Sequence, residues 1–131
     1  MFADMPSLLI TDDDVQFRQT LRGLFEPQGF QTLLAGDGEE ALEIVRTREV
    51  HLVLLDMHMP KLTGLETLRL VKQFKEMLPC ILMSADLDEG LIEQANRARA
   101  FSVLAKPVTS RQVTYAVRLA LQRTYQWPGE P

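Results

Sequence analysis

Four short apolar runs of the sequence each lead to polar residues that could take part in chemistry. These residues are Asp12 and Asp13, Asp56, Ser84 and Lys106. Crowded carboxylates raise one another's pKa unless a cation lies among them, and an all-oxygen ligand set suits Mg²⁺. An ammonium group and a hydroxyl group suit the oxygens of a phosphoryl group, over which charge spreads during transfer. The set therefore predicts Mg²⁺-dependent phosphorylation of a carboxylate, which would form an aspartyl phosphate.

These residues can meet only if the runs before them are neighbouring strands of one sheet. Leu52 to Leu55 is too short for a helix, and its unbroken apolar character is typical of a central parallel strand covered on both faces. Pro60 stops further pairing after Asp56. Ligands of open parallel sheets bind outside the carboxyl ends of the strands. We therefore expect a site there.

Five strand patterns alternate with five helix patterns along the chain. The expected strands cover 7–11, 30–35, 52–55, 79–83 and 101–105, and the expected helices cover 15–26, 39–46, 64–74, 88–99 and a last one capped by Thr109 or Ser110. Such alternation predicts an α/β fold with right-handed crossovers. We expect a three-layer αβα sandwich around a five-stranded parallel sheet, and the pattern fits the flavodoxin-like order 2-1-3-4-5.

Composition narrows the class of protein. The chain has 131 residues and a net charge of -4, which predicts one domain without the basic stripe of a nucleic-acid-binding protein. Its single cysteine, Cys80, cannot form an intramolecular disulfide, and a reduced thiol fits the cytoplasm. Neither a signal peptide nor a membrane span is recognisable. We expect a cytoplasmic protein that contacts neither membrane nor nucleic acid directly.

Taken together in their order and spacing, the motifs resemble a known family, the CheY-like receiver domains of two-component response regulators. The matching residues are Asp12-Asp13, Asp56 with Met59-Pro60 and Gly64, Ser84-Ala85, and Lys106-Pro107. The resemblance extends from about Ser7 to Leu121, which is nearly the whole chain. It implies a receiver domain over residues 1–122, followed by a tail or the start of a linker over 123–131, with no output domain in this chain.

The resemblance implies a role for each site residue. Asp56 would accept the phosphoryl group, Ser84 would be the switch hydroxyl, and Lys106 would contact the phosphoryl oxygens. Asp13 would bind Mg²⁺ directly, or Mn²⁺ in its place, and Asp12 would hold a metal-bound water. The implied metal ligands are Asp12, Asp13, Asp56 and the backbone carbonyl of His58.

The same resemblance implies the partners. The phosphodonor would be a sensor histidine kinase or a histidine phosphotransfer protein, and phosphorylation would switch a surface that binds a downstream protein. The chain would act as a signalling switch and not as a turnover enzyme. It would be a monomer or a phosphorylation-dependent dimer.

Two positions depart from the receiver pattern. Val103 occupies the place of the usual aromatic residue, and Arg99-Ala100 replaces the common Gly-Ala before the fifth strand. Because valine is small and has one strongly preferred rotamer, we expect a weaker switch carried by the backbone of residues 84–90. Phe101 is expected on the same side of the strand as Val103, by period-two alternation.

The acidic residues are also compatible with three other kinds of protein or site. A calcium-binding loop beginning at Asp12 fails because Phe17 and Gly23 occupy positions that require Gly and Glu. A haloacid-dehalogenase-like phosphohydrolase would use Asp12 as the nucleophile, but the only acid after Lys106 is Glu130. A receiver-like domain without phosphorylation is a third alternative, disfavoured by the intact polar set. We expect no direct part in the chemistry for two further polar residues. Asp14 is expected to cap a helix or to face solvent, and His51 is expected to be structural.

Overall fold

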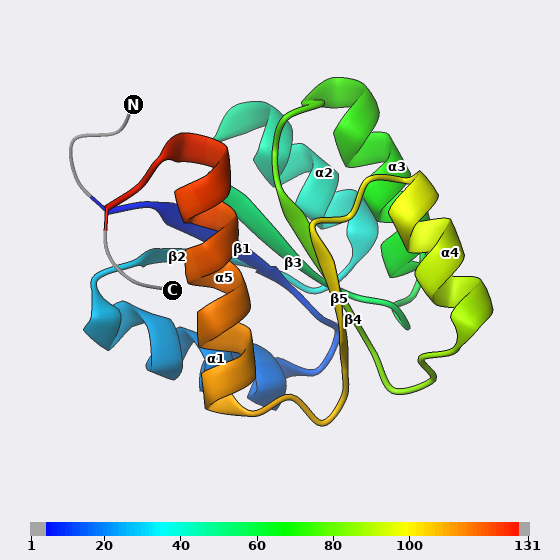
Figure 1. Ribbon diagram of the computed structural model, residues 1–131, viewed down its shortest axis with the longest axis horizontal. Helices are drawn as coiled ribbons and strands as arrows, with labels where there is room; N and C mark the ends of the chain where they lie inside the picture. Colours follow the sequence, from blue (N-terminus) through cyan, green and yellow to red (C-terminus); the bar gives the residue numbers. More distant parts are fainter. Residues whose placement is uncertain (1–4, 129–131) are drawn as a thin grey trace.

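A computed structural model describes residues 5–128 of the chain. Figure 1 shows its central twisted sheet with helices on both faces. The elements, in chain order, are β1 (Ser7–Thr11), α1 (Val15–Phe25), the 3₁₀ turn η1 (Glu26–Gln28), β2 (Gln31–Ala35), α2 (Gly38–Thr47), β3 (Leu52–Asp56), α3 (Gly64–Phe74), β4 (Cys80–Ser84), α4 (Glu89–Arg97), β5 (Ser102–Ala105) and α5 (Ser110–Tyr125). The strands are parallel in the order β2-β1-β3-β4-β5, which confirms the predicted fold.

The three inner strands separate two hydrophobic clusters. Leu8 and Leu54 belong to the cluster covered by α1 and α5, whereas Leu9 and Val53 belong to the cluster covered by α2, α3 and α4. Alternate residues of β1 and β3 thus face opposite layers, and every residue of β3 is buried. This double burial explains why the run before Asp56 is apolar without interruption.

Side-chain caps fix where the helices begin, and so the loops that carry the site. Asp14 caps α1 by accepting from the backbone N–H groups of Gln16 and Phe17, which confirms its predicted capping role. Thr63 and Glu66 form a reciprocal capping box at the start of α3, and Thr109 forms one with Gln112 at the start of α5. Each of these three helices is the next helix after a strand that ends at the carboxyl edge, so its cap fixes one end of a loop that borders the site.

The last helix is longer than predicted. It continues to Tyr125, so the first three residues of the predicted tail, 123–125, belong to α5. The hydroxyl of Tyr125 donates to the backbone carbonyl of His51 at 2.7 Å. Beyond the helix, the ring of Trp127 packs 5.4 Å from that of Phe30, and the Arg118 guanidinium lies over both rings. These tertiary contacts order the segment up to Trp127.

The expectation that Phe101 and Val103 share a side of the sheet is wrong. Phe101 packs against the cluster under α1 and α5, whereas Val103 packs against the opposite cluster. Phe101 lies before the first residue of β5, so strand alternation does not extend to it. Within residues 5–128, no helix has both the length and the apolar character needed to cross a membrane.

Candidate functional site

Three carboxylates meet at the carboxyl end of the sheet. Asp12 follows β1 directly, and Asp56 is the last residue of β3, the neighbouring strand. One oxygen from each of Asp12, Asp13 and Asp56 can be chosen so that all three lie within 4.8 Å of one another. Asp12 and Asp56 are buried, whereas Asp13 is exposed. The predicted convergence of these residues is therefore confirmed, and the cluster faces solvent through Asp13.

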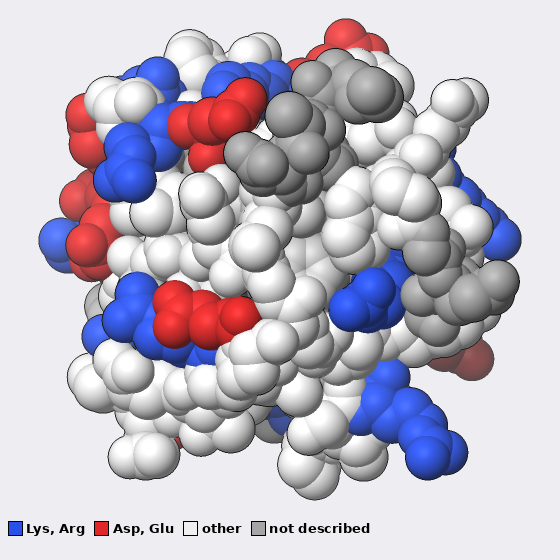
Figure 2. Space-filling model, turned by 90° about the vertical axis from the view of Figure 1, so that its left-hand side faces the viewer, with Lys and Arg blue, Asp and Glu red and all other residues white. Residues whose placement is uncertain are grey.

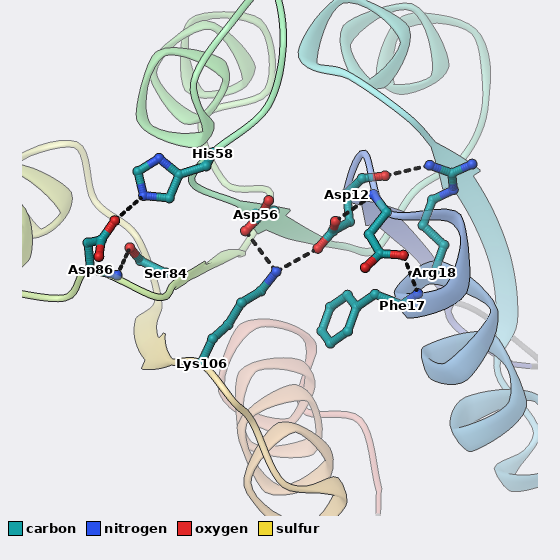
Figure 3. Close-up of polar contacts among 9 residues, drawn as sticks. Asp12, Phe17, Arg18, Asp56, His58, Ser84, Asp86 and Lys106 are labelled. Atoms are coloured by element: carbon teal, nitrogen blue, oxygen red, sulfur yellow. Dashed lines mark hydrogen bonds and ion pairs between the residues drawn. The ribbon is translucent and has the colours of Figure 1, made fainter.

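Lys106 lies between the two buried carboxylates. Its Nζ is 2.8 Å from Oδ2 of Asp12 and 2.9 Å from Oδ1 of Asp56 (Figure 3). Burial raises the pKa of Asp56, the Lys106 hydrogen bond opposes this, and the charges of Asp12 and Asp13 add to the rise. Burial works against the charge on Lys106, but hydrogen bonds to the two carboxylates outweigh it and raise the lysine pKa. One cation thus partly offsets three clustered carboxylates.

The first carboxylate is held in place by its own loop. Oδ1 of Asp12 accepts from the backbone N–H of Asp14 at 2.9 Å, and its Oδ2 accepts from Lys106. The guanidinium of Arg18 donates to the backbone carbonyl of Asp12 at 2.6 Å. Phe17 lies beside the Lys106 ammonium, 4.3 Å from its ring centroid. Arg18 and Phe17 were not predicted as site residues, because nothing in the sequence distinguishes them from other residues of an amphipathic helix.

The loop after β3 is fixed by close backbone contacts. The N–H of Met57 donates to the Met83 carbonyl, and the N–H of Gly64 donates to the Met57 carbonyl. A Cβ atom at Gly64 would lie 2.4 Å from the backbone oxygen of Asp56, so this position needs glycine for lack of space. Lys61 has a φ of 72° and forms ion pairs with two acids at the start of α2, which hold the loop from outside.

Ser84 and His58 border the same site on its β4 side. Ser84 is the last residue of β4 and is buried, and its Oγ accepts from the backbone N–H of Asp86 at 3.1 Å. The side chain of His58 pairs with that of Asp86, at 3.1 Å between Nε2 and Oδ2 (Figure 3). This exposed pair joins the loop after β3 to the loop after β4. The His58–Asp86 contact was not predicted, because it links two loops that are distant in sequence.

His51 has no part in this site, in agreement with its predicted structural role. It is buried before β3, and its Nδ1 accepts from the backbone N–H of Ser7 at 2.9 Å. Burial lowers its pKa, which favours the neutral imidazole that this hydrogen bond requires. The chemistry of the molecule therefore gathers at the other end of the sheet. There three carboxylates lie close to one lysine ammonium, and the Ser84 hydroxyl ends the neighbouring strand.

An α/β sheet with carboxylates, a serine and a lysine at its carboxyl edge defines a class, and comparison with known proteins identifies it. The response regulator receiver domain family matches residues 8–118. The chain belongs to this family, in which phosphorylation on aspartate and Mg²⁺ binding are standard.

Curated relatives agree with the family assignment. Sporulation initiation phosphotransferase F of Bacillus subtilis (strain 168) is 34% identical over 111 residues, covering 85% of this chain and 90% of that protein. Transcriptional regulatory protein CpxR of Escherichia coli (strain K12) is 33% identical over 124 residues, covering 92% of this chain and 51% of that protein. Against transcriptional regulatory protein ZraR of Klebsiella oxytoca, the chain spans only 28% of the relative's length.

Solved structures share the fold closely. A receiver domain from Clostridium thermocellum superposes with a TM-score of 0.87 at 29% identity, covering 93% of this chain and 98% of the other. A CheX–CheY complex with BeF3 and Mg²⁺ from Borrelia burgdorferi contains a chain with a TM-score of 0.85 at 28% identity, covering 88% of this chain and 89% of that one. A CheY-like receiver from Methanospirillum hungatei JF-1 reaches 0.90 at 20% identity, which supports the fold alone.

Proposed function

We propose that Asp56 of this receiver domain accepts a phosphoryl group in a Mg²⁺-dependent reaction. The observation that carries the proposal is the place of its carboxylate. Asp56 ends the central strand, with Oδ1 2.9 Å from the Lys106 ammonium and with Asp12 and Asp13 beside it. A rigid strand thus presents the carboxylate where a cation and acidic ligands can share the charge of an incoming phosphoryl group.

The donor set suits Mg²⁺, or Mn²⁺ in its place. Three carboxylates with oxygens within 4.8 Å supply the hard ligands that such ions prefer. Among the described residues Asp13 has no hydrogen bond or ion pair, which supports it as a direct ligand. Both oxygens of Asp12 are engaged, which supports contact through a metal-bound water. The backbone carbonyl of His58 is proposed as a further ligand. The ion, when bound, would neutralise charge on the transferring phosphoryl group.

Each protein group has a defined task in the transfer. A carboxylate oxygen of Asp56 attacks phosphorus and forms an O–P bond while the P–N bond to the donor histidine breaks. The electron pair of that bond leaves with the imidazole, and Lys106 stabilises the charge on the phosphoryl oxygens. The Ser84 hydroxyl is proposed to donate to the phosphoryl group. The N–H of Asp86 already approaches Ser84 Oγ, so movement of this serine would draw the β4–α4 loop with it.

The donor is proposed to be a sensor histidine kinase or a histidine phosphotransfer protein, and the output a contact with another protein. Direct contact with nucleic acid is not proposed. The net charge is -4, and Figure 2 shows basic and acidic side chains interspersed on the face it displays. Residues 1–122 are proposed as the receiver unit, in a cytoplasmic protein that is a monomer or dimerises on phosphorylation. Because Val103 stands where receivers usually have an aromatic residue, we expect phosphorylation to cause a smaller conformational change here.

Intact mass measurement with phosphoramidate and Mg²⁺ tests the proposed function. One phosphoryl group should be added to the wild type and none to Asp56→Ala. Removing Mg²⁺ with a chelator should stop the reaction, and Asp13→Ala should stop it even with Mg²⁺ present. An adduct that persists in Asp56→Ala but disappears in Asp12→Ala would favour the phosphohydrolase chemistry instead.

A further inference from the structure

The aromatic ring of Phe17 lies against the lysine of the site. Lys106 Nζ is 4.3 Å from the ring centroid, and the same ammonium contacts Asp12 at 2.8 Å and Asp56 at 2.9 Å. Figure 3 shows the ring beside the end of the lysine side chain, with the two carboxylates around the same ammonium group. The only groups that position the ammonium among the described residues are thus two carboxylates and one ring face.

Phe17 is itself held firmly. Its backbone N–H donates to the capping carboxylate of Asp14 at 3.2 Å, and its side chain packs against the hydrophobic cluster under α1 and α5. The next residue, Arg18, binds the Asp12 carbonyl and ties this turn of α1 to the end of β1. The position of the Phe17 ring relative to the carboxylates is therefore set by contacts of α1 and does not depend on Lys106.

A lysine reaching this site needs such support. Its charge is carried on a flexible four-carbon stem, so ordering the ammonium costs rotamer entropy. During phosphoryl transfer the Asp56 carboxylate becomes part of a mixed anhydride, so Lys106 must exchange its contact with that carboxylate for contacts with the phosphoryl oxygens. A ring face attracts an ammonium without competing for the proton or for the metal.

We propose that Phe17 is a positioning residue for phosphoryl transfer, whose ring face holds the Lys106 ammonium beside Asp56. The inference rests on the proposed function of Asp56 and goes beyond it, because it names a residue outside the polar set. Phe17 does not touch the phosphoryl group. It acts by keeping Lys106 at the place where that group enters.

The test compares Phe17→Leu with Phe17→Tyr. Leucine keeps an apolar side chain but removes the ring, whereas tyrosine keeps the ring face. Phosphorylation of Asp56 by phosphoramidate at saturating Mg²⁺ should slow about two- to fivefold in Phe17→Leu and recover in Phe17→Tyr. In NMR spectra, the ε-methylene protons of Lys106 should lose the upfield ring-current shift in Phe17→Leu and keep it in Phe17→Tyr.

Phe74→Leu is the matched control. Phe74 is also a helical phenylalanine with a cation over its ring, the Arg46 guanidinium at 5.8 Å, but it lies on α3 with Arg46 on α2. Its replacement should leave the phosphorylation rate and the Lys106 signals unchanged.

Two results would overturn the proposal for Phe17. One is a Phe17→Leu variant with the wild-type rate and unchanged Lys106 signals; the other is a folded Phe17→Tyr variant as slow as Phe17→Leu. A wild type that takes no phosphoryl group on Asp56 would instead refute the proposed function. In that case the NMR comparison still decides whether Phe17 positions Lys106.

Discussion

The buried polar groups at the two ends of the sheet are stabilised by different kinds of interaction. At the amino end, neutral groups satisfy one another: the Ser7 N–H donates to His51, and the Tyr125 hydroxyl donates to the His51 carbonyl. At the carboxyl end, the buried groups are charged, and Lys106 alone bridges Asp12 and Asp56. The acid that approaches His51 at the amino end, Glu49 at 3.9 Å from Nε2, is exposed and not buried. The carboxyl end holds more buried negative charge than its cation offsets.

This difference explains why one end can work as a switch. Neutral hydrogen bonds in a closed environment give a fixed structure that few ligands could improve. An excess of buried negative charge destabilises the protein alone, so any cation or group that redistributes the charge changes its energy. Burial raises the pKa of Asp56, and perturbed pKa values of this kind are common at functional sites. Four substitutions test this contrast, from the largest expected effect to the smallest.

Gly64→Ala should have the largest effect on the carboxyl end. The added Cβ would lie 2.4 Å from the Asp56 backbone oxygen and 2.7 Å from the Leu82 side chain, so the loop after β3 must move. We expect a loss of about 2–3 kcal/mol in the free energy of unfolding, together with slower phosphorylation. Denaturant unfolding measures the first effect and intact mass the second. Gly23→Ala is the control, since nothing lies within 4 Å of its Cβ position, and it should stabilise α1 by about 0.5–1 kcal/mol. Equal stability of the Gly64 variant and the wild type would contradict the tight contact.

Lys106→Met should lower the free energy of unfolding, because it removes the cation between the buried carboxylates. Removal of the cation leaves Asp12 and Asp56 buried without their counter-charge. Because the Lys106 side chain is partly exposed, we expect a cost of about 2 kcal/mol near neutral pH, below that of a fully buried pair. The folded-state pKa of Asp56 is already raised by burial, and losing the lysine raises it further. A raised carboxyl pKa means that stability is present at low pH and is lost as the pH rises through the folded-state pKa.

The cost of Lys106→Met should therefore shrink as the pH is lowered, and Mg²⁺ should stabilise this variant more than the wild type. Unfolding curves at several pH values, with and without Mg²⁺, measure both effects. If the variant were as stable as the wild type at neutral pH and insensitive to Mg²⁺, the carboxyl end would not be imbalanced as described.

Tyr125→Phe tests the amino end with a smaller change. The ring and its contact with His51 at 5.7 Å would remain, whereas the 2.7 Å hydrogen bond to the His51 carbonyl would be lost. We expect a loss of about 1 kcal/mol in the free energy of unfolding and an unchanged phosphorylation rate. Tyr115→Phe is the control, because Tyr115 is largely exposed and should be insensitive. A change in phosphorylation rate in Tyr125→Phe would show that the two ends are coupled.

His51→Asn should give the smallest effect, visible mainly in its pH dependence. Burial holds the pKa of His51 below its ordinary value of 6.5, so the unfolded chain binds the proton more readily than the folded one. The contribution of His51 is present above pH 6.5 and is lost as the pH falls toward the folded-state value. Asparagine does not titrate, so the variant should lose less stability than the wild type between pH 7.5 and 5. Parallel pH profiles of unfolding for the two proteins would argue against a neutral buried imidazole.

Much of the fold was predictable because local signals and the sheet pattern agree. The helix at Gly64–Phe74 was predicted with the bounds that the structure has, because apolar residues repeat along it at helical spacing. The structure adds that Thr63 caps its first turn. The end of α5 was missed because its last turn depends on a tertiary contact, the hydrogen bond of Tyr125 with residue 51. Phe101 was assigned to the wrong side because alternation was extended one residue beyond the strand.

The site residues that could be predicted are those that lie at the carboxyl ends of strands. Asp12 follows β1, Asp56 ends the neighbouring β3, and Lys106 follows β5, so all three lie at the carboxyl edge of one parallel sheet. The long lysine side chain then reaches past β4 to the two carboxylates. Phe17 and Arg18 could not be recognised in this way. Their positions on α1 are typical of an ordinary helix, and their contacts depend on how that helix is oriented against the strand ends.

The packing of Trp127 also has a practical consequence for optical measurements. Trp127 is the only tryptophan of the chain, and it lies against Phe30 and Arg118 at the amino end of the sheet. Its fluorescence should therefore change strongly when the protein unfolds or when the segment after α5 detaches. Magnesium or phosphoryl groups at the opposite end should leave the emission almost unchanged. Trp127 fluorescence should thus report unfolding of the protein without responding to events at the carboxyl end of the sheet.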